Sequence, residues 1–195
     1  MTAKSHPSLA FKREVLDAEG MRPILRRMAG ELLERDRDLE QLMLVGIHTR
    51  GVPLAERLAD EIERMEGKRP LFGTIDITLY RDDLSARPQP EVKQTRLPSP
   101  IDACVVVLCD DVLYTGRTVR AALDELNDYG RPRAVRLAVL VDRGHRELPI
   151  QADVVGKHVP TARAEVVDVG FEATDGGDYV HILEQTELER TQEEG

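Results

Sequence analysis

The most apolar stretch of the chain, residues 104–109 (CVVVLC), runs directly into two carboxylates, Asp110 and Asp111. An apolar run of this length between helical patterns is typical of a central strand in a parallel sheet. Two adjacent carboxylates at the end of such a strand are costly to bury unless they meet a metal, a cation or hydroxyl donors. The stretch therefore predicts an α/β fold that binds a polar ligand at the carboxyl end of its central strand.

The remaining pattern extends this prediction to a mostly parallel, twisted sheet flanked by helices. Apolar spacing predicts helices over 15–40, 53–66 and 119–129, and strands over 42–48, 74–80, 104–109, 135–141, 154–159, 165–169 and, at an edge, 179–183. Pro23 fits only in the first turn of its helix. Because no repeat or linker is evident, residues 1–184 are predicted to form one domain, followed by an acidic, frayed tail over 185–195.

Residues 81–100 interrupt this pattern. They include Pro88, Pro90, Pro98 and Pro100 and show no periodicity. A loop of that length inside a compact domain is usually either functional or disordered. We therefore expect this segment to lie outside the regular helices and strands.

Charge and composition restrict the class of protein. The formal net charge is −9, but residues 172–195 hold most of the excess, and residues 131–163 are locally basic. An acidic tail on a body of nearly balanced charge leaves an anionic partner possible. No apolar stretch approaches the length of a membrane span, and the first residues lack the apolar segment of a signal peptide. We expect a cytoplasmic protein, away from membranes, in which Cys104 and Cys109 are reduced and buried.

A short loop with a glycine and two threonines follows the acidic pair and opens a helix. Its backbone N–H groups, the hydroxyls of Thr115 and Thr118 and the helix dipole can together hold a phosphate monoester. Carboxylates followed by such a loop suit a ribose 5-phosphate, whose 2′ and 3′ hydroxyls the acids would bind. Neither GxxxxGK[ST] nor GxGxxG follows any of the predicted strands.

A second turn, Thr49-Arg50-Gly51, lies between the first predicted strand and a helix that starts with proline. Its glycine, the N–H groups of the helix start and the Arg50 guanidinium suit an anion. Taken alone, the same pattern fits an ordinary strand–helix turn, which is the commoner case.

These motifs resemble those of a known family. Residues 105–118 (VVVLCDDVLYTGRT) closely resemble the phosphoribosyl diphosphate signature of the type I phosphoribosyltransferases. Four further stretches, 45–51, 76–84, 130–150 and 152–161, resemble one subfamily, the bifunctional regulators of pyrimidine operon attenuation that also act as uracil phosphoribosyltransferases. The resemblance spans about residues 15–184. It implies the type I phosphoribosyltransferase fold, with a mobile flap over the active site at about residues 81–100.

The resemblance implies a role for each part of the site. Asp110 and Asp111 would bind the ribose hydroxyls and support positive charge in catalysis, and Arg81 in the flap would bring a cation to the leaving diphosphate. Arg143 and Val167 would lie beside the pyrimidine. The implied substrate-binding residues are Thr49, Arg50, Gly51, Val112, Leu113, Tyr114, Thr115, Gly116, Arg117, Thr118, Arg143 and Val167.

The implied reaction needs no protein nucleophile, and none is evident in the sequence. Uracil nitrogen would displace diphosphate from phosphoribosyl diphosphate, giving UMP. Mg²⁺ would bridge the diphosphate of the donor, and such a metal needs few protein ligands. That agrees with the five histidines, which show no metal-binding spacing.

The resemblance also implies regulation. Members of the subfamily sense uridine nucleotides, UMP or UTP, in the same site and then bind the leader mRNA of the pyrimidine operon. The candidate cations for RNA are Arg22, Arg26, Arg27, Arg146 and Lys157. Arg22 and Arg26 share a helix side, although simple solvation also produces charged helix faces. The family commonly forms homodimers or higher homo-oligomers.

Two other functions remain open from the sequence. One is a phosphoribosyltransferase of different base specificity, for a purine or for orotate, which residues 142–150 (DRGHRELPI) argue against. The other is a nucleotide-sensing RNA-binding regulator with little catalysis, which the intact acidic pair and phosphate loop argue against.

Overall fold

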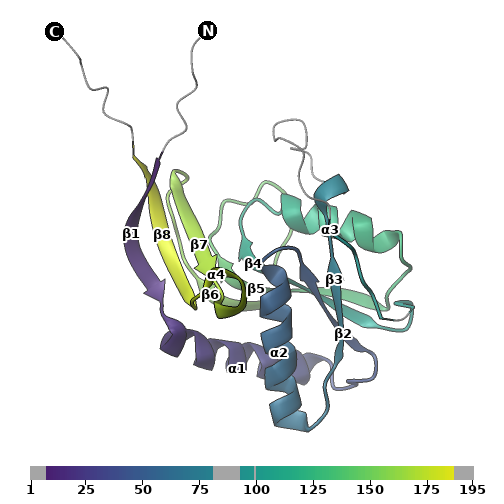
Figure 1. Cartoon of the computed structure of the whole chain (residues 1–195). Helices are drawn as coiled ribbons and strands as arrows, with labels where there is room; N and C mark the ends of the chain where they lie inside the picture. The colour runs from purple at the N-terminus through teal and green to yellow at the C-terminus, as the bar shows by residue number, and fades with distance from the viewer. Residues whose placement is uncertain (1–7, 81–92, 99, 187–195) are drawn as a thin grey trace, which may run out of the picture.

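A five-stranded parallel sheet forms the centre of the molecule (Figure 1). The computed structural model describes residues 8–80, 93–98 and 100–186. The strands lie in the order β3-β2-β4-β5-β6, with bounds β2 (Leu42–Ile47), β3 (Leu71–Ile75), β4 (Val105–Leu113), β5 (Ala134–Asp142) and β6 (Val154–His158). Every neighbouring pair is parallel, and β4 occupies the central position that its apolar run predicts.

Helices cover both faces of this sheet because alternate residues of β4 belong to two separate hydrophobic clusters. Val105 and Val107 pack with α1 (Ala18–Arg35) and α2 (Gly51–Glu66). Val106 and Leu108 pack on the other side with α3 (Arg117–Asn127). A short 3₁₀ turn, η1 (Thr78–Tyr80), follows β3.

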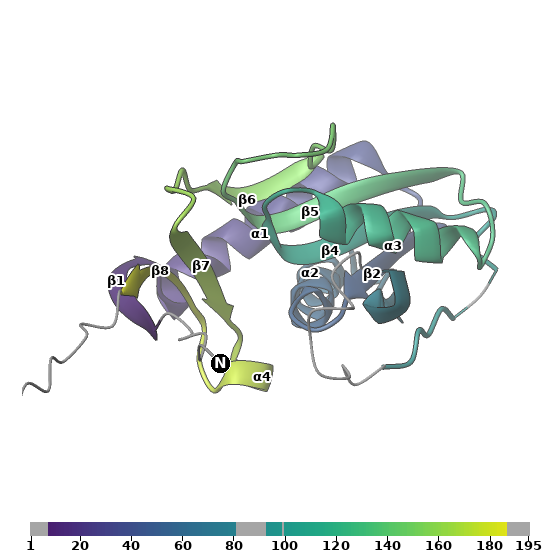
Figure 2. The same ribbon diagram turned by 90° about the horizontal axis from the view of Figure 1, so that it is seen from above.

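A second, antiparallel sheet stands to one side of the first (Figure 2). It has the order β1-β8-β7, with bounds β1 (Ser8–Leu16), β7 (Glu165–Gly170) and β8 (Tyr179–Thr186). The single turn α4 (Glu172–Asp175) joins β7 to β8. We call β1, β7, α4 and β8 together the hood. The first described residues therefore pair with the last ones, Ser8 with Thr186.

The hood corrects three sequence predictions. Residues 179–183 were expected at an edge, but β8 is the middle strand of its sheet. Residues 165–169 belong to the hood and not to the parallel sheet. Residues 15 and 16 are strand, because Asp17 has extended backbone angles and accepts a hydrogen bond from the Gly20 N–H at 2.8 Å, so α1 begins only after this cap.

Three further predictions need correction. Pro23 lies inside α1, past its first turn. The predicted strand over 74–80 ends at Ile75, because Asp76 accepts hydrogen bonds from the Thr78 N–H and hydroxyl at 3.0 and 2.6 Å and turns the chain, which leaves Leu79 68% exposed. Strand β4 continues beyond residue 109 to Leu113, so the acidic pair lies within the strand.

Candidate active site at the carboxyl end of the parallel sheet

The acidic pair occupies the carboxyl-terminal part of β4. Asp110 is buried, with 7% exposure, and Asp111 is half-buried. The Asp111 N–H donates to Asp110 Oδ1 at 3.1 Å. Burial raises the pKa of Asp111, while hydrogen bonding with Asp110 and the nearby Arg50 charge act in the opposite direction. The pair therefore offers carboxylate oxygens in a desolvated position, where a ligand rich in hydroxyl donors can bind.

The predicted phosphate loop follows the pair. Val112 and Leu113 are still in β4, and the turn itself is Tyr114–Gly116. Gly116 has φ +93°, a conformation that favours glycine, and α3 starts directly after it without a side-chain cap. The first N–H groups of α3 thus point toward the turn, where the Arg117 N–H lies 3.4 Å from Thr115 Oγ1, and a helix N-terminus of this kind favours an anion.

A neighbouring loop holds this turn in shape. The Thr115 carbonyl accepts from the N–H groups of Glu147 and Leu148 at 3.0 and 3.2 Å. Arg117, at the start of α3, is exposed and pairs with Glu147 at 2.9 Å. Thr118 lies in the first turn of α3 and is half-buried. The loop after β5 therefore supports the phosphate loop after β4.

The second predicted loop, Thr49-Arg50-Gly51, packs directly against β4. A Cβ on Gly51 would lie 2.1 Å from the Cys109 carbonyl oxygen and 3.3 Å from Asp110 Cα. Only glycine fits this approach, which brings the start of α2 beside the acidic pair. The peptide bond between His48 and Thr49 is cis.

Arg50 lies between this loop and the hood. Its Nη1 is 3.2 Å from Asp168 Oδ1 on β7, and its Nη2 is 3.0 Å from Asp175 Oδ1 on α4. A hydrogen bond from the Thr174 hydroxyl, followed by those from Arg50 and the Phe171 N–H, lowers the pKa of Asp175 to about 2. Sequence reasoning missed both carboxylates, because only the pairing of the hood strands places them near α2.

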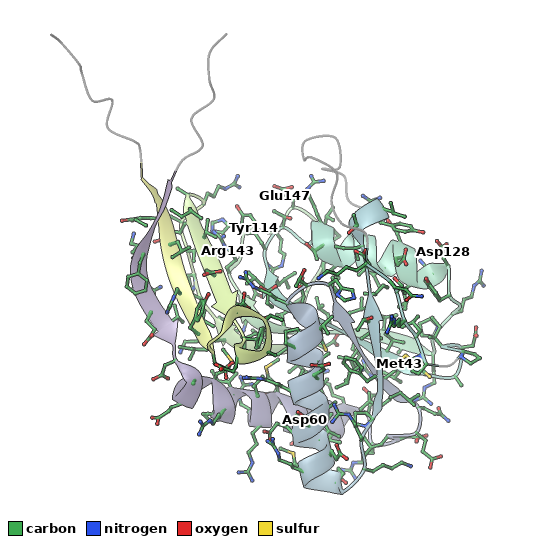
Figure 3. All side chains as sticks on the ribbon, in the orientation of Figure 1. Met43, Asp60, Tyr114, Asp128, Arg143 and Glu147 are labelled. Carbon is green, nitrogen blue, oxygen red and sulfur yellow. The ribbon has the colours of Figure 1, made fainter. Side chains whose placement is uncertain are left out.

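Arg143 lies below the surface rather than in open solvent. It is 6% exposed, its guanidinium stacks 4.2 Å above the Tyr114 ring, and it donates to Thr161 Oγ1 and to the carbonyls of Ala162 and Glu165 (Figure 3). Burial lowers the pKa of Arg143. The side chain joins the phosphate loop to the start of β7. Val167, the other residue expected near the base, is 9% exposed within the core.

The predicted RNA-binding cations differ in their surroundings. Arg146 donates to the carbonyls of Tyr114 at 2.7 Å and Ile150 at 3.1 Å and pairs with Asp142 at 2.5 Å, so it braces the phosphate loop. Arg27 binds the carbonyls of Val155 and Gly156 in β6 at 3.0 and 2.5 Å. Lys157 is exposed on β6.

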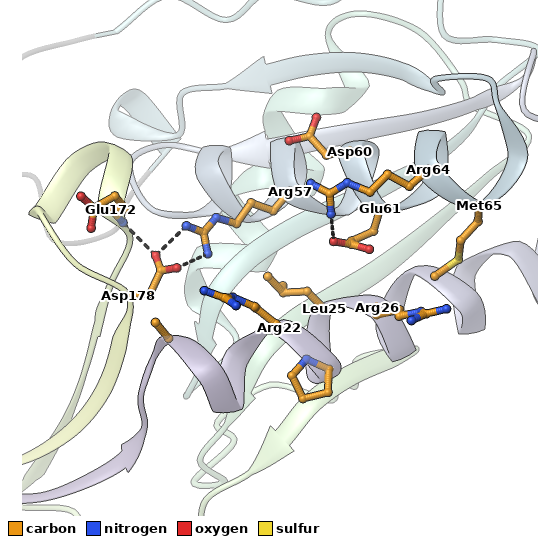
Figure 4. A pocket seen from close by; sticks show the side chains of 12 residues that line it. Arg22, Leu25, Arg26, Arg57, Asp60, Glu61, Arg64, Met65, Glu172 and Asp178 are labelled. Carbon is orange, nitrogen blue, oxygen red and sulfur yellow. Dashed lines mark hydrogen bonds and ion pairs between the residues drawn. The ribbon is translucent and has the colours of Figure 1, made fainter.

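Arg22 and Arg26 do lie together. Both are exposed and line a groove of about 1060 Å³ between α1 and α2 (Figure 4). The same groove contains further side chains of both signs, Arg57, Asp60, Glu61, Arg64, Glu172 and Asp178. Arg57 is held by both oxygens of Asp178 at 2.6 Å, so Arg22 and Arg26 are the predicted cations that this groove presents.

The described part of segment 81–100 runs beside β3. Thr74 and Arg96 exchange backbone hydrogen bonds of 2.9 and 2.8 Å, and Lys93 Nζ lies 3.4 Å from the Thr49 hydroxyl. The Lys93 N–H donates to Asp76, another buried acid that the sequence pattern did not reveal. Arg81 and most of the predicted flap lie outside the described residues.

Within residues 8–80, 93–98 and 100–186, no group of three or more His, Cys, Asp or Glu side chains is arranged to hold a metal ion. Within the same ranges, no helix combines the length and the apolar character that crossing a bilayer requires.

Comparison with known proteins agrees with this geometry. The family model described as "Phosphoribosyl transferase domain" matches residues 13–173. The chain is 56% identical over 178 residues to the "Bifunctional protein PyrR" of Thermus thermophilus, covering 91% of this chain and 98% of that protein. It is 53% identical over 182 residues to the protein of the same name from Deinococcus radiodurans, covering 92% and 99%.

Solved structures confirm the predicted fold. A hypoxanthine phosphoribosyltransferase from Staphylococcus aureus has a TM-score of 0.65 at 21% identity, covering 88% of this chain and 92% of that one. That of Trypanosoma cruzi has a TM-score of 0.68 at 15% identity, covering 90% and 98%. At these identities the similarity concerns the fold alone.

Proposed function

The chain belongs to the phosphoribosyltransferase family, and from this premise we propose that it is a uracil phosphoribosyltransferase that also regulates pyrimidine operon expression by binding leader mRNA. The observation that carries the proposal is the meeting of two loops at the acidic pair. Gly51 packs on β4 beside Cys109 and Asp110, and the phosphate loop follows the same strand directly after its last residue, Leu113. The two loops flank the carboxylates as the two ends of phosphoribosyl diphosphate flank its ribose.

The donor occupies this site in one orientation. Asp110 and Asp111 accept hydrogen bonds from the ribose hydroxyls, and the turn before α3 binds the 5′-phosphate. The loop Thr49–Gly51 binds the diphosphate, and Arg81 of the flap adds a cation. Mg²⁺ would bind through the diphosphate of the donor, beside the loop Thr49–Gly51, and would supply positive charge to the leaving group.

Transfer proceeds by displacement at the anomeric carbon. The bond from that carbon to the diphosphate oxygen breaks, the bond to uracil N1 forms, and the N1 proton leaves to solvent. Positive charge grows on the ribose in between, and Asp110 and Asp111 support it. The protein contributes orientation and electrostatic support, without a covalent intermediate.

Regulation uses the same pocket. UMP or UTP binds where donor and base meet, and Arg143 and Arg146 join that region to the loops after β5 and β6. Arg22 and Arg26 at the groove are the cations that we expect to contact RNA phosphates. We expect both uracil transfer and RNA binding to take place in the cytoplasm, with the protein present as a homodimer or higher homo-oligomer.

Two assays test the proposal. Purified protein is first incubated with phosphoribosyl diphosphate, Mg²⁺ and each of uracil, orotate and hypoxanthine, and nucleotide formation is measured. We expect UMP from uracil, and loss of transfer in the double variant Asp110→Asn, Asp111→Asn. Transfer to another base would overturn the specificity, and full activity of the double variant would overturn the ribose assignment.

The second assay measures binding to leader RNA from the protein's own pyrimidine operon, with and without UMP, at two salt concentrations. Binding that UMP strengthens and salt weakens is the expected result. A folded protein that binds UMP but no leader RNA would be a transferase without the regulatory role.

A further inference from the structure

Arg50 is restrained by the hood in this structure. It lies at the tip of the loop that is expected to receive the diphosphate, yet its two Nη atoms contact Asp168 and Asp175, which belong to the hood. Figure 1 shows α4 beside the first turns of α2, where these contacts form. The guanidinium is therefore directed toward two protein carboxylates.

Two carboxylates compete with an arriving anion for the Arg50 guanidinium. One guanidinium faces two carboxylates, and Asp111 adds a further negative charge close enough to affect Arg50. Lys93 Nζ, 3.4 Å from the Thr49 hydroxyl, adds a positive charge on the same loop, so the carboxylates occupy the donors of Arg50 in particular where a diphosphate has to bind. Each carboxylate competes with that ligand for the same N–H donors.

The two carboxylates differ in what else they do. Asp175 Oδ2 accepts hydrogen bonds from the Phe171 N–H at 3.1 Å and the Thr174 hydroxyl at 2.6 Å, so it also shapes α4. Asp168 lies in the middle of β7, opposite His181 in the sheet, and its other side-chain partner is the Tyr179 hydroxyl of β8, from which an amide oxygen could also accept. An amide at position 168 would keep the strand pairing and remove the charge.

The hood does not depend on Asp168 for its attachment to α2. Arg57, farther along α2, is clamped by both carboxylate oxygens of Asp178 at 2.6 Å and stacks 5.6 Å from the Phe171 ring. This pair fixes the hood to α2 without Arg50. The contact between Asp168 and Arg50 is therefore not the one that joins the hood to α2, and its effect falls on the Arg50 guanidinium.

We propose that Asp168 is a positioning residue for Arg50, which holds the guanidinium on the hood and lowers the affinity of the site for the diphosphate of the donor. The inference rests on the proposed function, because it takes the loop Thr49–Gly51 as the diphosphate site. Donor binding draws Arg50 away from Asp168, so the residue sets how tightly donor and product diphosphate are held.

The test is calorimetric titration of the full-length protein with inorganic pyrophosphate, in the presence and absence of Mg²⁺. Asp168→Asn should bind pyrophosphate about threefold to fivefold more tightly, the size of one screened ion pair near a protein surface. Glu184→Gln is the matched control, because it removes one charge from the same sheet, where Glu184 pairs with Lys12 at 3.0 Å. We expect its affinity to equal that of the wild type.

A double-mutant cycle then assigns the gain to Arg50. In an Arg50→Ala background, Asp168→Asn should bring no further tightening. In steady-state kinetics Asp168→Asn should lower the KM for phosphoribosyl diphosphate without raising kcat, since the gain is in ground-state binding. A purely structural role for Asp168 would not produce tighter binding.

Three results would overturn the inference. Unchanged or weaker binding by Asp168→Asn would show that the carboxylate does not compete with the ligand. Weakening confined to Mg²⁺-containing buffer would assign Asp168 to the metal instead. A wild-type protein that binds neither pyrophosphate nor phosphoribosyl diphosphate would remove the proposed function itself, and this inference with it.

Discussion

Replacing Gly51 by alanine tests the contact that assembles the site. The added Cβ would lie 2.1 Å from the Cys109 carbonyl oxygen, whereas real Cβ atoms essentially never come closer than 3.0 Å. The backbone of the loop or of β4 must therefore move by about 1 Å. Strand β4 is held on both sides by β2 and β5, so the loop is the part that yields.

The cost follows from this geometry. Overpacking a well-packed interior costs about 1–3 kcal/mol, and a clash between two backbone segments belongs at the upper end. At about 2–4 °C per kcal/mol for a chain of this size, Gly51→Ala should melt about 6–12 °C below the wild type. Because the loop Thr49–Gly51, the proposed diphosphate site, moves relative to Asp110, the KM for phosphoribosyl diphosphate should rise about tenfold or more.

Gly30 provides a matched control, because the same substitution there should change the stability in the opposite direction. It lies inside α1, and a Cβ there meets nothing within 4 Å. Gly30→Ala should stabilise the protein by about 0.5–1 kcal/mol through helix propensity and a less flexible unfolded chain. Differential scanning calorimetry and donor kinetics on both variants check these values. A Gly51→Ala protein with the melting temperature and KM of the wild type would refute the reasoning.

Three more predictions follow from other contacts. Arg146→Met should lower the free energy of unfolding by about 2–4 kcal/mol and weaken UMP binding, because it removes the arginine partner of the half-buried Asp142 and leaves this carboxylate with only the Gly144 N–H and His158 nearby; chemical denaturation and UMP titration measure both effects. The carboxyl of Asp175 has a folded pKa of about 2, below its unfolded value near 3.8, so its stabilisation is present above about pH 4 and is lost as the pH falls toward 2. Asp175→Asn should therefore flatten acid unfolding over that range, by about 1 kcal/mol after solvent screening; an unchanged acid transition would contradict this. The double variant Arg22→Ala, Arg26→Ala should weaken leader RNA binding and reduce its salt dependence, with uracil transfer as the check that the fold is intact; an unchanged salt slope would exclude this groove.

The parts of the site that lie next to each other in sequence could be predicted from it. A buried strand that runs into Asp110 and Asp111, followed by a glycine turn and a helix, places the carboxylates and the turn at the same edge of the sheet whatever surrounds them. The rule that ligand-binding turns follow the carboxyl ends of parallel strands also predicted the turn at Arg50, which follows the neighbouring strand β2. The predicted end of this strand, at residue 109, was wrong. Strand β4 continues to Leu113 because its pairing with β5 extends past both charged residues.

The partners of the arginines could not be predicted. Arg50 meets Asp168 and Asp175 only because the hood packs beside the start of α2; Asp175 is 125 positions further along the chain, and no local pattern reports such a contact. Arg146 was expected at an RNA surface, yet its guanidinium binds carbonyl groups of two loops, since a long cationic side chain can turn inward wherever carbonyls are available. Charge alone does not distinguish these two uses of arginine.

The pairing of β1 with β8 also has a consequence for biosynthesis. All five strands of the parallel sheet have been synthesised once β6 is complete, and chains begin to collapse while they are still being made. The N-terminal strand β1, however, can pair only after β8 has been synthesised, and until then the backbone N–H and C=O groups along its edge are open to other chains. Premature termination between β6 and β8 would thus leave β1 without its partner strand and the cluster around α1 and α2 without Val180 and Ile182, and both defects favour aggregation.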